Sequence, residues 1–277
     1  MPTKTVLIPT TDGLQADAFA AYPDDGERHP AVLMYMDAFG LRPVLEEMAR
    51  EMAGHGYYVL VPNVYYRHGP GPVVELPAYI GEDVRPAIID RLRPFIVAHT
   101  TERVLRDADA YVGFLTAQPE VTAGRIAVTG YCMGGLWATR TALAHPDEVA
   151  ALAVFHPGFL VTDAPDSPHR HFAPLTAEVH VGLSENDMSP EAVAELNGAL
   201  DAAGVTHTTE IYPGTAHGFT MPDTAAFSPT GLRHHWARLL PLLNRTLPTG
   251  KAPPGARARR REPEASLKTG PRGVFPA

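Results

Sequence analysis

Continuous apolar runs alternate along the chain with segments that mix apolar and polar residues. The runs at residues 31–36, 57–61, 125–129 and 149–155 are almost wholly apolar or β-branched, which is typical of strands covered on both faces. Further strands are predicted at residues 6–9, 15–22, 178–183 and 207–212, and helices at residues 44–55, 83–98, 102–116, 136–144, 190–203 and 230–247. This alternation predicts an α/β fold, with a mostly parallel central sheet and helices on both faces.

Two segments without a clear period are predicted to form long loops over the edge of the sheet. Residues 64–81 are rich in Tyr, Gly and Pro, and residues 157–174 are rich in Pro, Asp and His. Loops of this length are often functional. Within the helix predicted at residues 83–98, Pro86 and Pro94 are expected to mark breaks.

The body of the chain, residues 1–249, is predicted to be a single domain because it contains no internal repeat and no Gly/Ser linker. Residues 250–277 form a Pro/Arg-rich tail with seven basic and two acidic residues, a composition that predicts disorder. The whole chain has a formal net charge of −8, so the body is more acidic than this total. An acidic body argues against nucleic acid as a partner, and the arginines at 257–261 are either solvated or a contact for an acidic partner.

The single cysteine excludes an intrachain disulfide and a cysteine-based zinc cluster. The N-terminal segment lacks the features of a signal peptide, and no apolar run reaches membrane-spanning length. These observations predict a cytoplasmic protein without a membrane partner, in which a thiol stays reduced. No cofactor or metal is predicted, because residues 69–72 lack the Lys and Ser/Thr of a phosphate-binding loop and His169-Arg170-His171 is a weak metal pattern.

Cys132 lies in the sequence Gly-Tyr-Cys-Met-Gly-Gly at residues 130–135, between a predicted strand and a predicted helix. Strand, G-x-C-x-G and helix form the pattern of a nucleophile elbow, with cysteine in place of the usual serine. In so sharp a turn, a side chain at Gly130 or Gly134 would collide with neighbouring backbone. The pattern predicts a reactive sulfur beside a helix N-terminus. The alternative is a small buried hydrophobic residue, the usual role of a lone cysteine.

A cysteine nucleophile needs a base and a group that orients the base. Asp187 follows a predicted strand at the edge where ligand chemistry collects in α/β sheets, so it is the predicted acid, with Glu185 as the second choice. His217 follows the last predicted strand in a Gly-rich loop and is the predicted base. The N–H groups of Met133 and Ala38 are the predicted oxyanion hole, since this fold takes one donor after the nucleophile and one from the loop after an early strand.

Together these segments resemble the dienelactone hydrolase family, a branch of the α/β-hydrolase fold. The resemblance rests on G-Y-C-M-G-G at residues 130–135, the Asp187 loop and G-T-A-H-G-F at residues 214–219, and it spans most of residues 1–247. It implies an α/β-hydrolase fold and a catalytic triad of the cysteine, aspartate and histidine already singled out. It also implies cofactor-free hydrolysis of an enol-lactone or related ester through an acyl-cysteine intermediate.

The resemblance further implies a glutamate after the third strand that holds the resting thiol, but this chain has the shorter Asp37 at that position. Either Asp37 orients the thiol or it only caps its own loop. Members specific for dienelactone pair the substrate carboxylate with arginines, a role that suits the guanidinium fork. Arg67 and Arg85 are the candidates here, and a solvated surface charge is the alternative for each.

Several aromatic residues and one histidine lie at predicted strand ends or in the adjoining loops, where they either form the wall of a substrate pocket or pack in the core. They are Tyr35, Tyr65, Tyr66, Tyr131, His156 and Phe219. The predicted function is a cysteine-dependent hydrolase of small esters or lactones that is a monomer or a small homo-oligomer. The alternatives are a non-catalytic member that binds a small ligand or a partner, and an acyltransferase.

Overall fold

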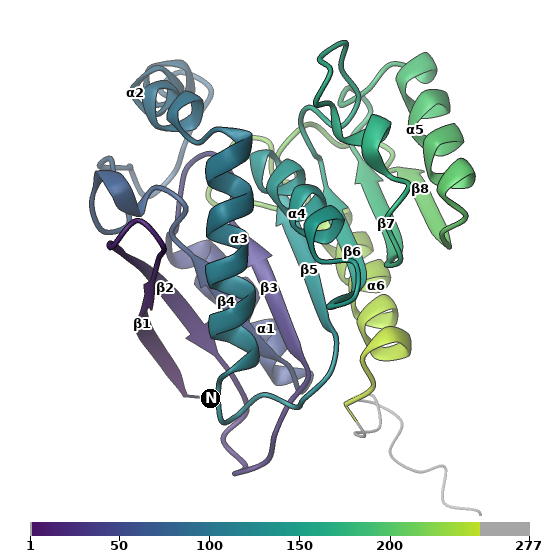
Figure 1. The fold of residues 1–277 in the computed structure, drawn as a ribbon. Coiled ribbons are helices and arrows are strands. Elements are labelled where there is room, and N and C mark those ends of the chain that lie inside the picture. The colour runs from purple at the N-terminus through teal and green to yellow at the C-terminus, as the bar shows by residue number, and fades with distance from the viewer. Residues whose placement is uncertain (1, 250–277) are drawn as a thin grey trace, which may run out of the picture.

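The computed structural model describes residues 2–249, which fold around an eight-stranded sheet (Figure 1). The strands follow the order β1-β2-β4-β3-β5-β6-β7-β8. The pairings β1–β2 and β2–β4 are antiparallel, and the pairings from β4 across to β8 are parallel, so the predicted mostly parallel α/β sheet is confirmed. The strands are β1 (Thr3–Pro9), β2 (Gln15–Ala21), β3 (Ala31–Tyr35), β4 (Tyr58–Pro62), β5 (Ile126–Tyr131), β6 (Val149–Phe155), β7 (Glu178–Leu183) and β8 (His207–Ile211).

The central strands are covered on both faces, as their continuous apolar sequences predict. Every residue of β3, β4, β5 and β6 is buried. Helices α3, α4 and α5 lie on one face of the sheet, and α1 and α6 lie on the other (Figure 1). The helices are α1 (Pro43–Gly54), α2 (Arg85–Ala98), α3 (Thr101–Thr116), α4 (Met133–Ala144), α5 (Pro190–Ala203) and α6 (Pro229–Thr246).

Helix α2 stands above the carboxyl ends of the parallel strands (Figure 1). It runs without interruption from Arg85 to Ala98, so the predicted breaks at Pro86 and Pro94 are wrong. Pro86 lies in the first turn, where backbone N–H groups have no intrahelical partner and proline is tolerated. Pro94 removes one backbone hydrogen bond inside the helix without ending it.

The two predicted loops are largely irregular in the structure. They contain only the short 3-10 turns η1 (Tyr66–His68) and η2 (Pro168–His171). Helix α4 begins at Met133, directly after Cys132 and three residues earlier than predicted. The reason is local: two glycines weaken the helical signal in the sequence, but the turn needs them for close packing.

The predicted tail, residues 250–277, lies outside the described residues. Among residues 2–249, every helix falls short of the length or the apolar character that a bilayer crossing requires. The fold therefore favours a site at the carboxyl edge of the parallel strands, where β3, β5, β6 and β7 end.

Two histidines are buried behind that edge of the sheet. His180 Nε2 on β7 lies 3.1 Å from the Tyr212 hydroxyl, and His235 Nε2 on α6 lies 3.0 Å from the Tyr131 hydroxyl. Burial lowers the pKa of His180 to about 4 and the pKa of His235 to about 3. Both side chains therefore stay neutral in the folded chain at mildly acidic pH, where a histidine in an unfolded chain is protonated.

We expect each of these histidines to lower the free energy of unfolding by about 1.4 kcal/mol for every unit by which the pH is lowered, from about 6.5 down to about 4. In this range the unfolded state takes up the proton and the folded state does not. Carboxylates with lowered pKa, such as Asp187, act only at lower pH. Chemical denaturation at several pH values checks this, and His235→Phe should show a dependence shallower by one proton. Equal slopes for the variant and the wild type would contradict the assignment.

Candidate active site

Cys132 occupies the sharp turn between β5 and α4, in a backbone conformation that residues other than glycine rarely adopt. Its φ is 54° and its ψ is −117°. A Cβ on Gly130 would lie 2.0 Å from the carbonyl oxygen of Gly134, and a Cβ on Gly134 would lie 2.3 Å from the carbonyl oxygen of Met36. The close approach of backbone therefore requires both glycines, and the strain of the turn is concentrated at Cys132.

The end of β6 holds this strained turn in place. The Cys132 N–H donates to the Phe155 carbonyl at 3.1 Å, and the Gly158 N–H donates to the Cys132 carbonyl at 3.2 Å. A Cβ on Gly135 would lie 2.7 Å from Pro157 Cβ, so α4 also packs closely on this segment. The sulfur is thereby fixed at the carboxyl edge of the sheet on a half-buried side chain.

His217 and Asp187 meet beside the cysteine from two loops that are distant in sequence. His217 Nδ1 donates to Asp187 Oδ1 at 2.6 Å, and the Ser184 N–H donates to Asp187 Oδ2 at 2.5 Å. Burial would raise the pKa of Asp187, but these hydrogen bonds hold it below its usual value. The exposed Glu185 instead accepts from the Gly214 N–H at 2.8 Å, so the structure brings the first choice of acid, not the second, to the imidazole.

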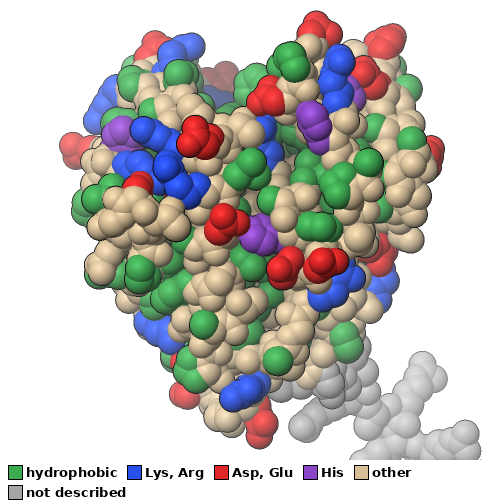
Figure 2. Space-filling model, in the orientation of Figure 1, with side chains coloured by type: hydrophobic (Ala, Val, Ile, Leu, Met, Phe, Trp, Pro, Cys, Tyr) green, Lys and Arg blue, Asp and Glu red, His purple; other side chains and the backbone are tan. Residues whose placement is uncertain are grey.

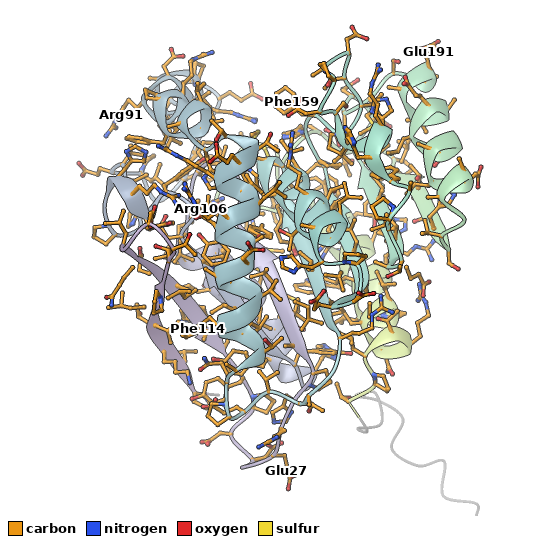
Figure 3. All side chains as sticks on the ribbon, in the orientation of Figure 1. Glu27, Arg91, Arg106, Phe114, Phe159 and Glu191 are labelled. Carbon is orange, nitrogen blue, oxygen red and sulfur yellow. The ribbon has the colours of Figure 1, made fainter. Side chains whose placement is uncertain are left out.

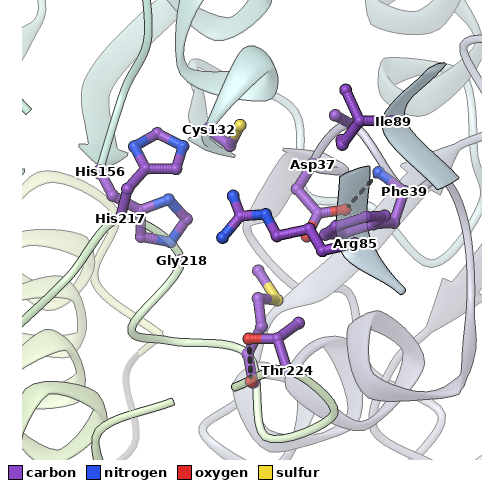
Figure 4. A pocket seen from close by; sticks show the side chains of 11 residues that line it. Asp37, Phe39, Arg85, Ile89, Cys132, His156, His217, Gly218 and Thr224 are labelled. Carbon is purple, nitrogen blue, oxygen red and sulfur yellow. Dashed lines mark hydrogen bonds between the residues drawn. The ribbon is translucent and has the colours of Figure 1, made fainter. Parts of the chain in front are cut away.

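The electrostatics of His217 favour the protonated ring. Burial alone would lower its pKa, but its hydrogen bonds to the Asp187 carboxylate and to the Cys132 sulfur raise the pKa to about 10. The imidazole is therefore cationic at neutral pH. A cationic ring beside the sulfur stabilises a thiolate, the reactive form of cysteine. Figure 4 shows Cys132 and the His217 ring on the same side of one cavity.

The two N–H groups predicted to bind an oxyanion belong to Met133, directly after Cys132, and to Ala38, which lines the same cavity as Cys132. The Met133 N–H opens α4 and has no intrahelical acceptor. The Gly40 N–H donates to the Asp37 carbonyl at 3.2 Å, so the Ala38 N–H of the same trans peptide points the opposite way. The Tyr65 hydroxyl donates to the Ala38 carbonyl at 3.1 Å and fixes the next peptide. Tyr65 thus supports this loop from behind.

A small cavity, open to solvent, lies over the sulfur. Figure 2 shows the surface hollowed between α2 and the loop after β6, and Figure 3 labels Arg91 on α2 and the exposed Phe159 on the opposite rim. The residues that line the cavity are Asp37, Ala38, Phe39, Arg85, Ile89, Cys132, His156, His217, Gly218, Met221 and Thr224.

The two candidate arginines have different surroundings. Arg85, on the first turn of α2, reaches into the cavity toward the two imidazoles (Figure 4) and has no carboxylate partner within residues 2–249. Arg67 instead bridges Asp12, at 2.7 Å, and Asp107, with two contacts of 2.7 Å, and does not line the cavity. The structure therefore leaves Arg85 free for a ligand and places Arg67 in an internal ion-pair network.

Asp37 lines the cavity, but its carboxylate is engaged away from the sulfur. Arg42 Nη1 and Nη2 donate to its two oxygens at 2.6 and 3.0 Å, and the Phe39 N–H donates to Oδ1 at 3.0 Å. Cys132 is not among its hydrogen-bond partners in the described chain. The contacts thus place Asp37 with the Ala38 loop, and they do not show the thiol-orienting arrangement that the resemblance suggested.

His156 is the predicted wall residue that does reach the cavity. Its φ is 39°, its Nε2 lies 2.8 Å from the Thr220 hydroxyl, and its ring centroid lies 5.2 Å from that of His217 at 70°. Burial, reinforced by the neighbouring His217 charge, lowers the pKa of His156 well below its usual value. A neutral imidazole therefore packs against the cationic one.

The other predicted wall residues pack in the interior. Tyr35 is buried and its hydroxyl lies 2.8 Å from the Thr141 hydroxyl. Tyr131 bonds His235, and Phe219 packs on His156 behind the cavity. The Tyr66 hydroxyl donates to Asp107 in the Arg67 network. For these residues the contacts favour core packing, one of the two alternatives that the sequence left open.

The weak metal pattern in the second loop has local partners. His169 Nε2 lies 2.7 Å from Glu195 Oε1, and His171 Nε2 lies 2.9 Å from the Pro165 carbonyl. Within residues 2–249, no three His, Cys, Asp or Glu side chains are grouped to hold a metal ion. The two histidines therefore belong to the packing of the loop after β6.

Sequence reasoning missed several residues at the site. Arg42 and Asp223 form a partly buried ion pair at its edge, and Ile89, Met221 and Thr224 line the cavity. A charged residue in an early loop and an aspartate 181 positions later give no local signal of their pairing. Only Met221 had an indication, since it follows the G-T-A-H-G-F segment that carries the histidine.

The family model described as the dienelactone hydrolase family matches residues 16–247. A carboxymethylenebutenolidase from a Pseudomonas species is 29% identical, over 87% of this chain and 98% of that protein.

Solved structures share the fold. A dienelactone hydrolase-like promiscuous phosphotriesterase from metagenomic libraries has a TM-score of 0.70 at 19% identity, covering 89% of this chain and 100% of that one. A dienelactone hydrolase from Anabaena variabilis has a TM-score of 0.61 at 13% identity, covering 89% and 98%. Together with the sheet order and the match over most of the body, these findings show that the chain belongs to the dienelactone hydrolase family of α/β-fold hydrolases.

Proposed function

We propose that this hydrolase uses Cys132 as its nucleophile, His217 as its acid and base, and Asp187 to orient the histidine, on small esters or lactones. The observation that carries the proposal is the convergence of Cys132 and His217 on one cavity, with Asp187 Oδ1 2.6 Å from the far nitrogen of the imidazole. A nucleophile, a base and an orienting carboxylate in this relation form the triad arrangement of acyl-transfer enzymes.

In the first half of the reaction, the Cys132 thiolate attacks the carbonyl carbon of the substrate and a C–S bond forms. The carbonyl oxygen becomes an oxyanion that accepts hydrogen bonds from the N–H groups of Met133 and Ala38. As the C–O bond breaks, His217 Nε2 gives its proton to the leaving oxygen. In a lactone, that oxygen stays tethered to the acyl group.

In the second half, the now neutral His217 accepts a proton from water, and the hydroxide oxygen adds to the thioester carbonyl. The C–S bond breaks, the carboxylic acid product leaves, and the thiolate–imidazolium pair is restored. Asp187 keeps the proton-bearing Nδ1 directed away from the sulfur throughout. A free thiol nucleophile suits a reducing compartment, so we also propose a cytoplasmic location.

The acyl-cysteine intermediate is the direct test of this mechanism. We expect intact-mass measurement after rapid acid quenching with an activated ester to show the protein plus one acyl group. Peptide mapping should place that group on Cys132, the single cysteine. Turnover without any acylated protein, or acylation at another residue, would overturn the proposed nucleophile.

We further propose that Arg85 binds an anionic group of the substrate, because it is a cation in the cavity without a carboxylate partner in the described chain. Arg85→Gln is expected to raise KM about 10- to 100-fold for a carboxylated lactone, the range of a lost charged hydrogen bond. The KM for a neutral ester should stay within about threefold, because no ion pair forms there.

Arg91→Gln is the matched control for this prediction. Arg91 lies on the same helix, is exposed, and donates only to the Glu75 carbonyl, at 3.4 Å. Steady-state kinetics with both substrates should leave this control unchanged. An equal rise in KM for the neutral and the carboxylated substrate in Arg85→Gln would contradict the assignment of Arg85.

A further inference from the structure

Arg42 is a buried cation held between two carboxylates at the edge of the cavity. Its side chain is 4% exposed. On one side it donates to both oxygens of Asp37, and on the other its Nε and Nη2 donate to Asp223 at 2.6 and 3.2 Å. A guanidinium suits this role because its planar fork bonds carboxylates with two parallel hydrogen bonds.

The Asp37 side of this cluster closes the loop that carries the Ala38 donor. Asp37 Oδ1 accepts from the Phe39 N–H at 3.0 Å, and Arg42 Nη1 also donates to the Gly40 carbonyl at 3.3 Å. Hydrogen bonds from Asp37 and Arg42 therefore hold both ends of the turn at residues 37–40. For Asp37 to swing toward the sulfur, it would have to leave Arg42 and the Phe39 N–H together.

The Asp223 side joins this turn to the loop that carries His217. Asp223 lies six residues after His217, and its carbonyl accepts from the Ile80 N–H at 2.8 Å. The Ala225 N–H donates back to the Ile80 carbonyl at 3.1 Å, so the same segment is tied to the chain that leads into α2. Arg42 thus connects the loop that carries Ala38 with Asp223, and the backbone of Asp223 in turn contacts Ile80 in the segment before α2.

A buried ion pair of this kind is weak evidence for a stabilising role, since desolvation offsets much of its attraction. Its value for catalysis is positional. Oxyanion donors act only when they are held at hydrogen-bond distance from the developing charge, and small displacements lower rates strongly. Ala38 lies on an irregular loop, whereas Met133 is fixed by α4, so Ala38 is the donor that needs external support.

We propose that Asp37 and Arg42 are positioning residues that hold the Ala38 donor in place, and that Asp223 extends this clamp to the His217 loop. The proposal rests on the function proposed above and deepens it: position 37 acts on the oxyanion hole and not on the thiol. Because the donor loop is already closed by the ion pair, the oxyanion hole exists before substrate arrives.

The two roles for Asp37 predict opposite outcomes for Asp37→Asn. The asparagine keeps the size of the side chain and an oxygen for the Phe39 N–H, but it loses the ion pair to Arg42. We expect kcat for an activated ester to fall about 10- to 100-fold, with little change in KM. The upper end of this range corresponds to the loss of one oxyanion donor. We expect the rate of Cys132 alkylation by iodoacetamide to stay within about twofold, because this reaction uses the thiolate but forms no oxyanion.

Asp107→Asn is a matched control, because Arg67 bridges Asp107 and Asp12 in the same way that Arg42 bridges Asp37 and Asp223. Asp107 is equally buried and does not line the cavity. We expect both this control and Asp37→Asn to lower the melting temperature, and we expect the control to keep kcat. Arg42→Lys, which keeps the charge without the fork, should repeat the split between turnover and alkylation and serves if Asp37→Asn does not fold.

Three results would overturn the proposal. Alkylation that slows together with turnover in Asp37→Asn would mean that Asp37 acts on the thiol. An unchanged kcat would mean that the clamp does not support the donor, and an equal loss of kcat in Asp107→Asn would mean that the effect is general destabilisation. Each of these leaves Cys132-dependent turnover of the wild type intact, whereas failure of the proposed function removes that dependence itself.

Discussion

Cys132→Ala should lower kcat/KM for activated esters by at least about 1000-fold. Removing the nucleophile of a triad forces any remaining turnover to rely on the oxyanion donors and substrate binding. Alanine fits the site, since the turn already places a Cβ at φ 54° and the sulfur bears no packing role in the core. The melting temperature should therefore stay close to that of the wild type. Loss of activity with an unchanged fold is the expected result.

The measurement is steady-state hydrolysis of an activated ester, with thermal unfolding of both proteins as the control for folding. Cys132→Ser adds a second comparison. A serine retains a hydroxyl that His217 can activate as a general base, so this variant should retain more activity than the alanine variant. Wild-type activity in Cys132→Ala would remove the nucleophile from the proposal, and with it the acyl-cysteine.

The nucleophile elbow was predictable because its signal is local. Strand, two spaced glycines and helix fall within about twenty residues, and the collisions of 2.0 and 2.3 Å at Gly130 and Gly134 show why no other residues fit. His217 was predictable for the same reason, since a short Gly-containing segment after the last strand identifies it. In both cases backbone geometry imposes the sequence pattern.

What the sequence did not reveal depends on contacts between distant segments. The sequence around Arg85 and Arg67 does not distinguish them. In the structure Arg85 lines the cavity and has no carboxylate partner among residues 2–249, whereas Arg67 lies between two aspartates. Arg42 and Asp223 are 181 positions apart, so no periodicity relates them. The role of Asp37 depends on which side chain its carboxylate contacts. That side chain is Arg42, for which the sequence predicted no function.

Asp187→Asn should lower kcat/KM by roughly 1000- to 10,000-fold, although the side chain hardly changes in size. The Ser184 N–H still finds an oxygen, but the amide can present its NH₂ to His217 Nδ1. The imidazole would then carry its proton on Nε2 in the neutral form and could not accept one from water. The raised pKa of His217 should fall too, because the negative charge beside it is lost.

Glu185→Gln is the control that separates this effect from loop damage. Glu185 lies two residues away, is exposed, and accepts from the Gly214 N–H, a bond that glutamine also makes. Its kcat/KM should stay within about fivefold of the wild type. The rate of Cys132 alkylation at neutral pH gives a second readout: it should fall in Asp187→Asn, where His217 loses the charge that favours its protonated form, and stay unchanged in Glu185→Gln. If both variants lose activity equally, the carboxylate that orients His217 is misassigned. The 2.6 Å contact between His217 Nδ1 and Asp187 Oδ1 predicts that only Asp187 matters. The tautomer of an imidazole is fixed by the acceptor that its ring N–H meets.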